Sequence, residues 1–262
     1  MVQLKSVGVL SAAKISAAMG IVLGLIYAVI IFAVGSALSP FLASTPVGRY
    51  LPAIGLGLLI VVPVVVCVLS FICAAIEAFL YNVITPRIGY VEIDLKGGRL
   101  NHIGELSLGK VLGVAGVIIG FVAGVIIAFF VGPLISSMVP MASSVAWPIM
   151  IIAVPVVCGL LFFVGGILEA FVYNVLASAI GGVKLNIAKG ELRSVEVVSY
   201  MKISGASGLI WGLVSGVLSF NAASLVTAPI SNLVAGLIGA GVVGLLYNWL
   251  AKPVGGIKLD IR

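Results

Sequence analysis

Charged side chains are scarce in this sequence. Only 8% of its 262 residues are Asp, Glu, Lys or Arg, whereas 62% are hydrophobic. Soluble domains carry about 25% charged residues, so a chain this poor in charge could not cover a surface that faces water. The composition excludes an ordinary soluble protein and predicts an integral membrane protein, in which lipid is part of the solvent.

Residues for metal or redox chemistry are also few. The sequence has one histidine, His102, and three cysteines, Cys67, Cys73 and Cys158, each within an apolar run. An odd cysteine count in such a setting argues against a disulfide framework. His102 with the nearby Glu105 makes a poor metal site. We therefore expect no metal and no cofactor.

Long apolar runs are what the chain does have. A transmembrane helix needs about 20 predominantly apolar residues, and six segments meet that requirement. The predicted helices are Ala13–Val34, Pro52–Val83, Lys110–Val131, Pro148–Leu176, Lys202–Phe220 and Pro229–Leu250. The first of these is too long for a typical signal-peptide core and belongs to the repeat described next, so we expect it to be retained.

One sequence unit occurs three times, over residues 1–98, 99–190 and 191–262. Each copy opens with a leucine that lies seven residues before a Ser-x-x-Lys motif, and the lysine is followed by two glycines spaced four apart. The motif residues are Ser11 and Lys14, Ser107 and Lys110, and Ser199 and Lys202. A fixed repeat of this kind defines the architecture; each copy contains two of the predicted helices.

Each copy also ends alike. A Tyr-Asn pair is followed by a glycine eight residues after the tyrosine, and then by a short stretch in which apolar and polar residues alternate. These residues are Tyr81, Asn82 and Gly89; Tyr173, Asn174, Gly181 and Gly182; and Tyr247, Asn248, Gly255 and Gly256. The alternation predicts a β-strand with one polar face, and the paired glycines allow a sharp turn from helix to strand.

Strands at both ends of each copy predict how the copies connect. Lys96–Arg99 and Ala188–Glu191 have the residues of tight hairpin turns, so the end of one copy should pair with the start of the next. We expect the last strand of the chain to pair with the first, which would close a ring of three hairpins. The predicted fold class is an all-α transmembrane protein with a small β element: six helices as three parallel strand-helix-helix-strand repeats around a pseudo-threefold axis, with cytoplasmic β-hairpins.

The basic residues predict the orientation. Every Lys and Arg except Arg49 lies on the side of both chain ends, and cytoplasmic segments carry an excess of Lys and Arg. We expect a multi-pass protein of the cell membrane with both termini in the cytoplasm. The net charge of +6 does not indicate nucleic-acid binding, because the charges lie in short connections rather than on one helix face.

Few residues are candidates for chemistry. A Ser-x-x-Lys pair occurs in some acylating enzymes, but its threefold occurrence at helix starts favours a serine cap and a lysine that extends to the headgroups. Glu77 and Glu169 are the candidate contacts for an ion or a partner, because ionisable residues in a membrane helix are functional candidates. Interfacial ion pairing is the favoured interpretation, because both lie near the cytoplasmic ends of their helices, where a carboxylate can reach water or a lysine. The third copy has Val243 at this position.

The Tyr-Asn pairs have a structural interpretation. A tyrosine near the end of a membrane helix is typical of the aromatic belt at the interface. We expect the asparagine beside it to satisfy backbone groups where the helix ends. The glycine pairs after each Ser-x-x-Lys motif should let helices approach closely, either around the pseudo-threefold axis or against the second helix of the same copy.

The repeat resembles a family of small two-helix membrane proteins, the actinobacterial transmembrane domain family of unknown function. The Ser-x-x-Lys start, the two apolar helices and the Tyr-Asn-x6-Gly-Gly-Ile-Lys-Leu ending, as in Tyr247–Leu259, carry the resemblance, which covers nearly the whole chain in three copies. It implies the architecture of the repeat and no catalytic residues. It also implies that single-repeat members assemble as trimers, of which this chain would be a fused version.

Two functions fit these patterns. The first is a non-enzymatic membrane scaffold or accessory subunit, because polar groups are nearly absent from the predicted helices. Its partners would be membrane lipids and other membrane protein subunits. The alternative is a small ion or solute channel or transporter with a path along the pseudo-threefold axis. An intramembrane enzyme is the least favoured.

Overall fold

The computed structural model describes residues 1–42, 46–138 and 143–262. Six strands and six helices follow one another in the described chain, and all six helices are long and apolar enough to cross a membrane. The elements are β1 (Val2–Val7), α1 (Val9–Leu42), α2 (Pro46–Ile88), β2 (Val91–Lys96), β3 (Arg99–Ile103), α3 (Glu105–Met138), α4 (Ser143–Ile180), β4 (Leu185–Ala188), β5 (Glu191–Val195), α5 (Val197–Leu218), α6 (Ser224–Val254) and β6 (Ile257–Ile261).

All six helices extend beyond their predicted bounds at the strand end, and all except α5 extend at the far end as well. α3 and α5 begin at Glu105 and Val197, five residues before the lysines at which we predict their starts. α2, α4 and α6 continue to the residue before a glycine with positive φ. The prediction was wrong at the starts of α3 and α5 because the added turns contain Ser107 and Ser199, polar residues that bind the strands, as described below.

The six strands close into a β-ring, the name we use for β1–β6 together. Five antiparallel pairings give the order β3-β2-β1-β6-β5-β4. The two outer strands then meet, because the Leu100 N–H donates to the Val183 carbonyl at 2.9 Å and the Leu185 N–H donates to the Gly98 carbonyl at 2.6 Å. Every strand therefore has a partner on both sides, and the ring has no free edge of the kind that promotes aggregation.

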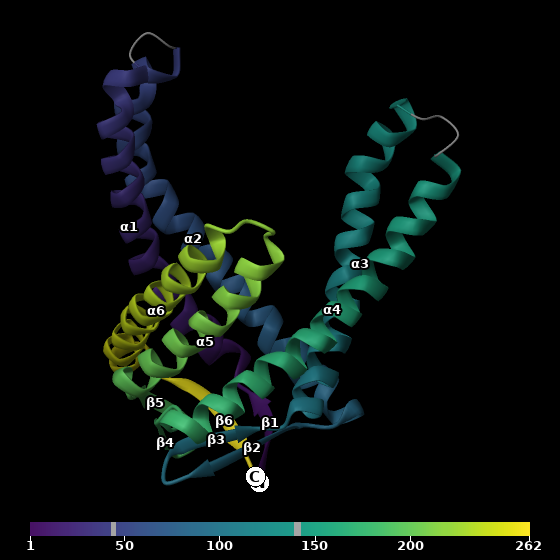
Figure 1. The fold of residues 1–262 in the computed structure, drawn as a ribbon, viewed down its shortest axis with the longest axis vertical. Coiled ribbons are helices and arrows are strands. Elements are labelled where there is room, and N and C mark those ends of the chain that lie inside the picture. The colour runs from purple at the N-terminus through teal and green to yellow at the C-terminus, as the bar shows by residue number, and fades with distance from the viewer. Residues whose placement is uncertain (43–45, 139–142) are drawn as a thin grey trace.

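The two chain ends meet in this ring, as predicted. β6 pairs with β1, and Gln3 and Arg262 exchange backbone hydrogen bonds of 2.6 and 3.0 Å. Figure 1 places both termini together at the end of the molecule that carries the strands. The predicted hairpin turns are also confirmed: β2 and β3 are joined at Gly97-Gly98, and β4 and β5 at Lys189-Gly190, with positive φ at both central residues of each turn, as type I′ turns require.

The helices form three helical hairpins, α1–α2, α3–α4 and α5–α6, in each of which the two helices pack closely. The glycines of the first helix face the proline of the second. A β-carbon on Gly24 would lie 2.7 Å from the α-carbon of Pro63, and one on Gly120 would lie 2.8 Å from that of Pro155. The third hairpin repeats the contact at Gly212. Of the two predicted arrangements, the glycines take the one against the partner helix of the same hairpin.

Among the described residues, the buried contacts between different hairpins gather near the β-ring. Three small clusters of buried residues lie there, between α2 and α3, between α4 and α5, and between α6 and α1, and each packs on residues of the strands. Ile84 belongs to the first of these clusters, Val172 to the second and Ile15 to the third. Above them the hairpins diverge, and in Figure 1 the far ends of α1–α2 and α3–α4 lie well apart.

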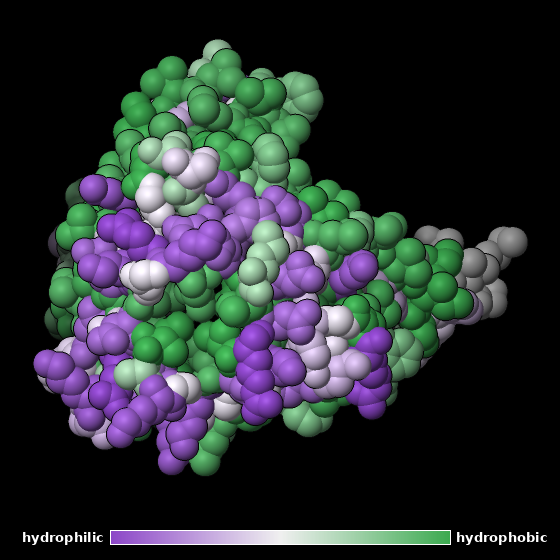
Figure 2. Space-filling view, turned by 90° about the horizontal axis from the view of Figure 1, so that it is seen from below, coloured by the Kyte–Doolittle hydropathy of each residue, from purple (hydrophilic) through white to green (hydrophobic). Residues whose placement is uncertain are grey.

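The two ends of the molecule differ in polarity. Seen from the side of the β-ring, hydrophilic side chains gather over the strands around a smaller hydrophobic area, whereas the diverging helices are hydrophobic (Figure 2). Large side chains such as Phe129, Phe130 and Leu161 are exposed along the helices. The apolar surface requires lipid or other membrane proteins around the helices, with the β-ring in water.

Candidate functional site

The Tyr-Asn pair of each copy fastens a helix to the β-ring. The Tyr173 hydroxyl donates to the Leu100 carbonyl at 2.6 Å and accepts from the Val183 N–H at 3.1 Å. The Asn174 side chain accepts from the N–H of Ile103 and donates to its carbonyl, each at 2.8 Å. The equivalent bonds join Tyr81 and Asn82 to Leu4 and Val7, and Tyr247 and Asn248 to Leu192 and Val195.

These contacts correct two predictions. The tyrosine hydroxyls are bound to strand carbonyls, so the prediction of a simple interfacial belt misses their role. The asparagines satisfy backbone groups where an odd-numbered strand passes into the next helix, not where their own helix ends. Because the partners lie far away along the chain, 71 residues in the case of Asn174 and Ile103, each pair ties together the two ends of one copy.

The serine of each Ser-x-x-Lys motif makes a second set of ties. The Ser107 hydroxyl donates to the Gly104 carbonyl at 2.8 Å and accepts from the Glu92 N–H at 3.1 Å. Ser11 binds Gly8 and Lys258 in the same way, and Ser199 binds Glu196 and Lys184. The serines therefore lie in the first helical turn and join it to a strand, rather than capping the helix as predicted.

The same geometry weighs against Ser/Lys catalysis. Each serine proton is donated to a carbonyl of its own helix start. Lys14, Lys110 and Lys202 are exposed, and none makes a hydrogen bond or ion pair within the described ranges. A nucleophilic serine needs a base that takes its proton, and the three motifs do not provide one.

The glycines after the Tyr-Asn pairs have steric roles. Gly89, Gly181 and Gly255 end their helices with φ of 105°, 85° and 90°, a region that other L-residues rarely adopt. A β-carbon on Gly182 would lie 1.8 Å from the Leu100 carbonyl oxygen, and one on Gly256 would lie 2.0 Å from that of Leu192. The two glycine pairs thus let the chain enter the β-ring, as the sequence predicts.

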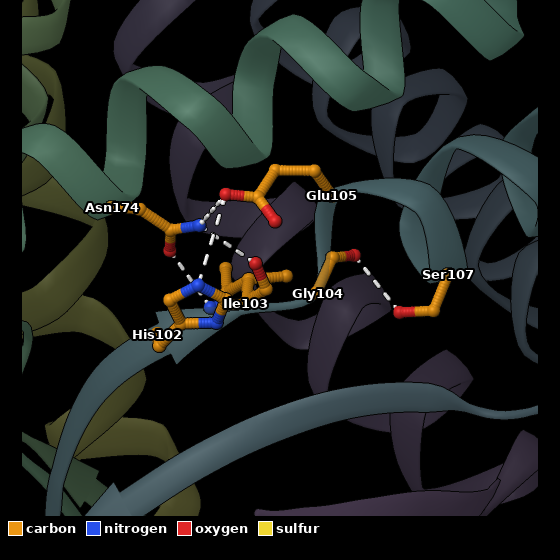
Figure 3. Close-up of polar contacts among 6 residues, drawn as sticks. All are labelled: His102, Ile103, Gly104, Glu105, Ser107 and Asn174. Atoms are coloured by element: carbon orange, nitrogen blue, oxygen red, sulfur yellow. Dashed lines mark hydrogen bonds and ion pairs between the residues drawn. The ribbon is translucent and has the colours of Figure 1, made fainter.

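The second copy carries an additional polar cluster at its junction, drawn in Figure 3. Asn174 also donates to the Glu105 carboxylate at 2.6 Å, and Nε2 of His102 lies 3.7 Å from the same oxygen. Nδ1 of His102 is buried without a hydrogen-bond partner in the described part of the chain. In the other copies Ser6 and Val9, or Ser194 and Val197, stand at the positions of His102 and Glu105.

This cluster borders a polar pocket, but its described residues do not supply the set of ligands that a metal ion usually needs. The pocket, of about 400 Å³, is lined among others by Tyr90, Glu92, His102, Glu105 and Lys110. Within the described residues no group of three or more His, Cys, Asp and Glu side chains is arranged to hold a metal ion. The pocket is lined by both acidic and basic side chains, which suits ion pairs exposed to solvent at the surface of the β-ring.

The two candidate carboxylates, Glu77 and Glu169, lie in separate places. Glu77 lines an almost wholly apolar pocket of about 400 Å³ between α2 and α3. Glu169 lines a pocket of about 410 Å³ formed mainly by α4 and α5. Neither makes an ion pair or hydrogen bond to any described residue, so the predicted interfacial ion pairing is not found.

The pocket of Glu169 contains residues that sequence reasoning missed. Tyr200, Ser204 and Ser207 line it from α5. Their spacing of four and then three residues places them on one face of a helix, and that periodicity was the signal that could have found them.

Comparison of the chain with protein-family models, curated proteins and solved structures finds no match.

Proposed function

We propose that the chain is a non-enzymatic integral membrane scaffold or accessory subunit, with the β-ring as a rigid base and the helical hairpins as the partner-binding elements. The observation that carries this proposal is the divergence of the hairpins above the β-ring. A helix surrounded by other helices of its own chain would be buried, whereas the upper helices here expose large apolar side chains. Such surfaces can be covered by lipid or by helices of other subunits.

The proposal includes the repeat arrangement and the orientation. Three strand-helix-helix-strand repeats, 1–98, 99–190 and 191–262, would surround a pseudo-threefold axis, and both termini would lie in the cytoplasm of a cell membrane. The threefold occurrence of the Tyr, Asn and Ser contacts supports the repeats. The basic residues on the β-ring and the adjoining helix ends support the orientation. The resemblance to the two-helix family remains a prediction.

A channel or transporter along the axis has less support. Such a path needs helices that enclose it and polar groups that follow one another along it. The carboxylates of Glu77 and Glu169 line different pockets, the first of them apolar, and the third copy has Val243 at that position.

Photo-crosslinking combined with native purification tests the scaffold proposal. The crosslinking residue p-benzoylphenylalanine replaces Phe129, which is 66% exposed on α3, and the matched control places it at Leu106 beside the β-ring. We expect a membrane subunit that co-purifies in a fixed ratio in mild detergent and that crosslinks from position 129 far more than from position 106.

A lone particle without such crosslinks would contradict the scaffold proposal. The channel proposal would replace the scaffold proposal if that particle also conducted ions in liposomes and if replacement of both Glu77 and Glu169 with Gln stopped the conduction.

A further inference from the structure

The α4–α5 pocket, as we call the Glu169 pocket, lies directly above the β-ring. Glu169 is one helical turn from Tyr173, whose hydroxyl binds the ring. The floor of the pocket includes Ile103 and Val183, and its α5 wall carries Tyr200, Ser204 and Ser207. With the β-ring in water and the helices in lipid, this position falls at the level where lipid headgroups meet hydrocarbon.

Apart from Tyr173, the polar side chains of this pocket have no hydrogen-bond partner among the described residues. The carboxylate of Glu169 and the hydroxyls of Tyr200, Ser204 and Ser207 form no hydrogen bond with any described residue. In the same helix the hydroxyls of Ser199 and Ser215 donate to carbonyls, as does that of Ser219 at its C-cap. Four unpaired polar groups that converge on one hollow are typical of a binding site.

Nothing in the pocket neutralises the carboxylate. Lys202 is the nearest lysine along α5, but it is exposed and does not line the pocket. Lys110 of α3 lines two other pockets, both together with Ile88 at the end of α2. A carboxylate at the edge of hydrocarbon is stabilised by a positive partner, and none of the described residues that line the pocket is basic.

We propose that the α4–α5 pocket binds an ammonium group carried on an apolar body, such as an amine-bearing lipid headgroup or a free alkylamine. Glu169 supplies the counter-charge, and the hydroxyls of Ser204 and Ser207 accept hydrogen bonds from the ammonium protons. The rings of Tyr173 and Tyr200 provide faces that attract a cation, while the aliphatic walls cover the attached chain. A bare metal ion carries no apolar body and would gain nothing from the aliphatic walls.

The other copies provide a built-in comparison. Glu77 occupies the equivalent position in the first copy, yet its pocket is walled by Ile118, Ile119 and Val122 instead of serines. A Glu77→Gln variant removes the same charge from an equivalent helix without touching the α4–α5 pocket. This inference does not depend on the scaffold proposal, because a scaffold and a channel could equally carry such a site.

The test is calorimetric titration of the full chain in dodecyl maltoside with n-octylammonium chloride, with n-octanol as the neutral probe of equal chain length. We expect one saturable ammonium site in the wild type and in Glu77→Gln, and no saturable binding of octanol. Glu169→Gln should weaken the affinity about tenfold or more, because a hydrogen bond to a charged group is worth well over 1 kcal/mol. The double variant S204A/S207A should weaken it less.

A second arm identifies the source of the ammonium group. The protein is reconstituted into nanodiscs of phosphatidylglycerol with or without phosphatidylethanolamine, and native mass spectrometry counts the retained lipids. Retention of phosphatidylethanolamine that is lost in Glu169→Gln assigns a lipid headgroup, and Glu169-dependent binding of octylammonium alone assigns a free amine. Equal binding by wild type and Glu169→Gln in both arms would overturn the proposal.

Discussion

Replacement of Asn174 with alanine removes one of the ties between helix and β-ring. The N–H and carbonyl of Ile103 would lose their partners, each at 2.8 Å. A buried backbone group left unpaired costs about 1–3 kcal/mol. Because this junction is half-buried and admits some water, we expect the two groups together to cost about 2–3 kcal/mol of local stability.

Hydrogen exchange of the Ile103 amide measures that cost directly. A loss of 2–3 kcal/mol corresponds to exchange that is roughly 30-fold to 150-fold faster. Asn248→Ala is the matched control, since Asn248 makes the same two bonds to Val195 but none to a carboxylate. It should speed exchange at Val195 and leave Ile103 unchanged. The reasoning is refuted if Ile103 exchanges at the wild-type rate in Asn174→Ala while the amide of Val195 does respond to its own substitution.

Three further predictions concern the β-ring and the helical hairpins. Gly182→Ala places a β-carbon 1.8 Å from a carbonyl oxygen and should lower the unfolding temperature by several degrees, whereas Gly239→Ala, which meets nothing within 4 Å, should not. Gly120→Val should separate α3 from α4 and destabilise the protein by about 1–3 kcal/mol, measured by thermal unfolding in detergent with Gly239→Val as control. Cysteines at Gln3 and Arg262, with the native cysteines replaced, should form a disulfide in the oxidised full chain; their failure to do so would contradict the closed ring.

Some features of the fold could be predicted from local sequence patterns and from the repeat. The hairpin turn at Gly97-Gly98 follows from two residues that accept positive φ. The pairing of β6 with β1 follows from the repeat, because the strand that ends each copy pairs with a strand that starts a copy. Six helices follow from the length of the apolar runs. These features depend on local chemistry or on the repetition of one unit along the chain.

The role of the Tyr-Asn pairs could not be predicted, because it depends on partners far away in the sequence. An asparagine at the end of an apolar helix gives no sign that it binds Ile103 rather than its own helix. The divergence of the hairpins could not be predicted either. An apolar helix has the same sequence pattern whether lipid or another helix covers side chains such as Phe129. The spacing of Tyr200, Ser204 and Ser207 is enough to place them on one face of a helix.

Spin-label distances in lipid nanodiscs test the divergence of the hairpins most directly. Labels on exposed positions of two hairpins, Ile31 on α1 and Phe130 on α3, report how far apart the upper helices lie. Packed helices have axes about 8–10 Å apart. We predict a distance distribution centred beyond about 20 Å, twice that separation, with the open space filled by lipid or partner helices. A narrow distribution at the spacing of packed helices would show a closed six-helix bundle and contradict the account.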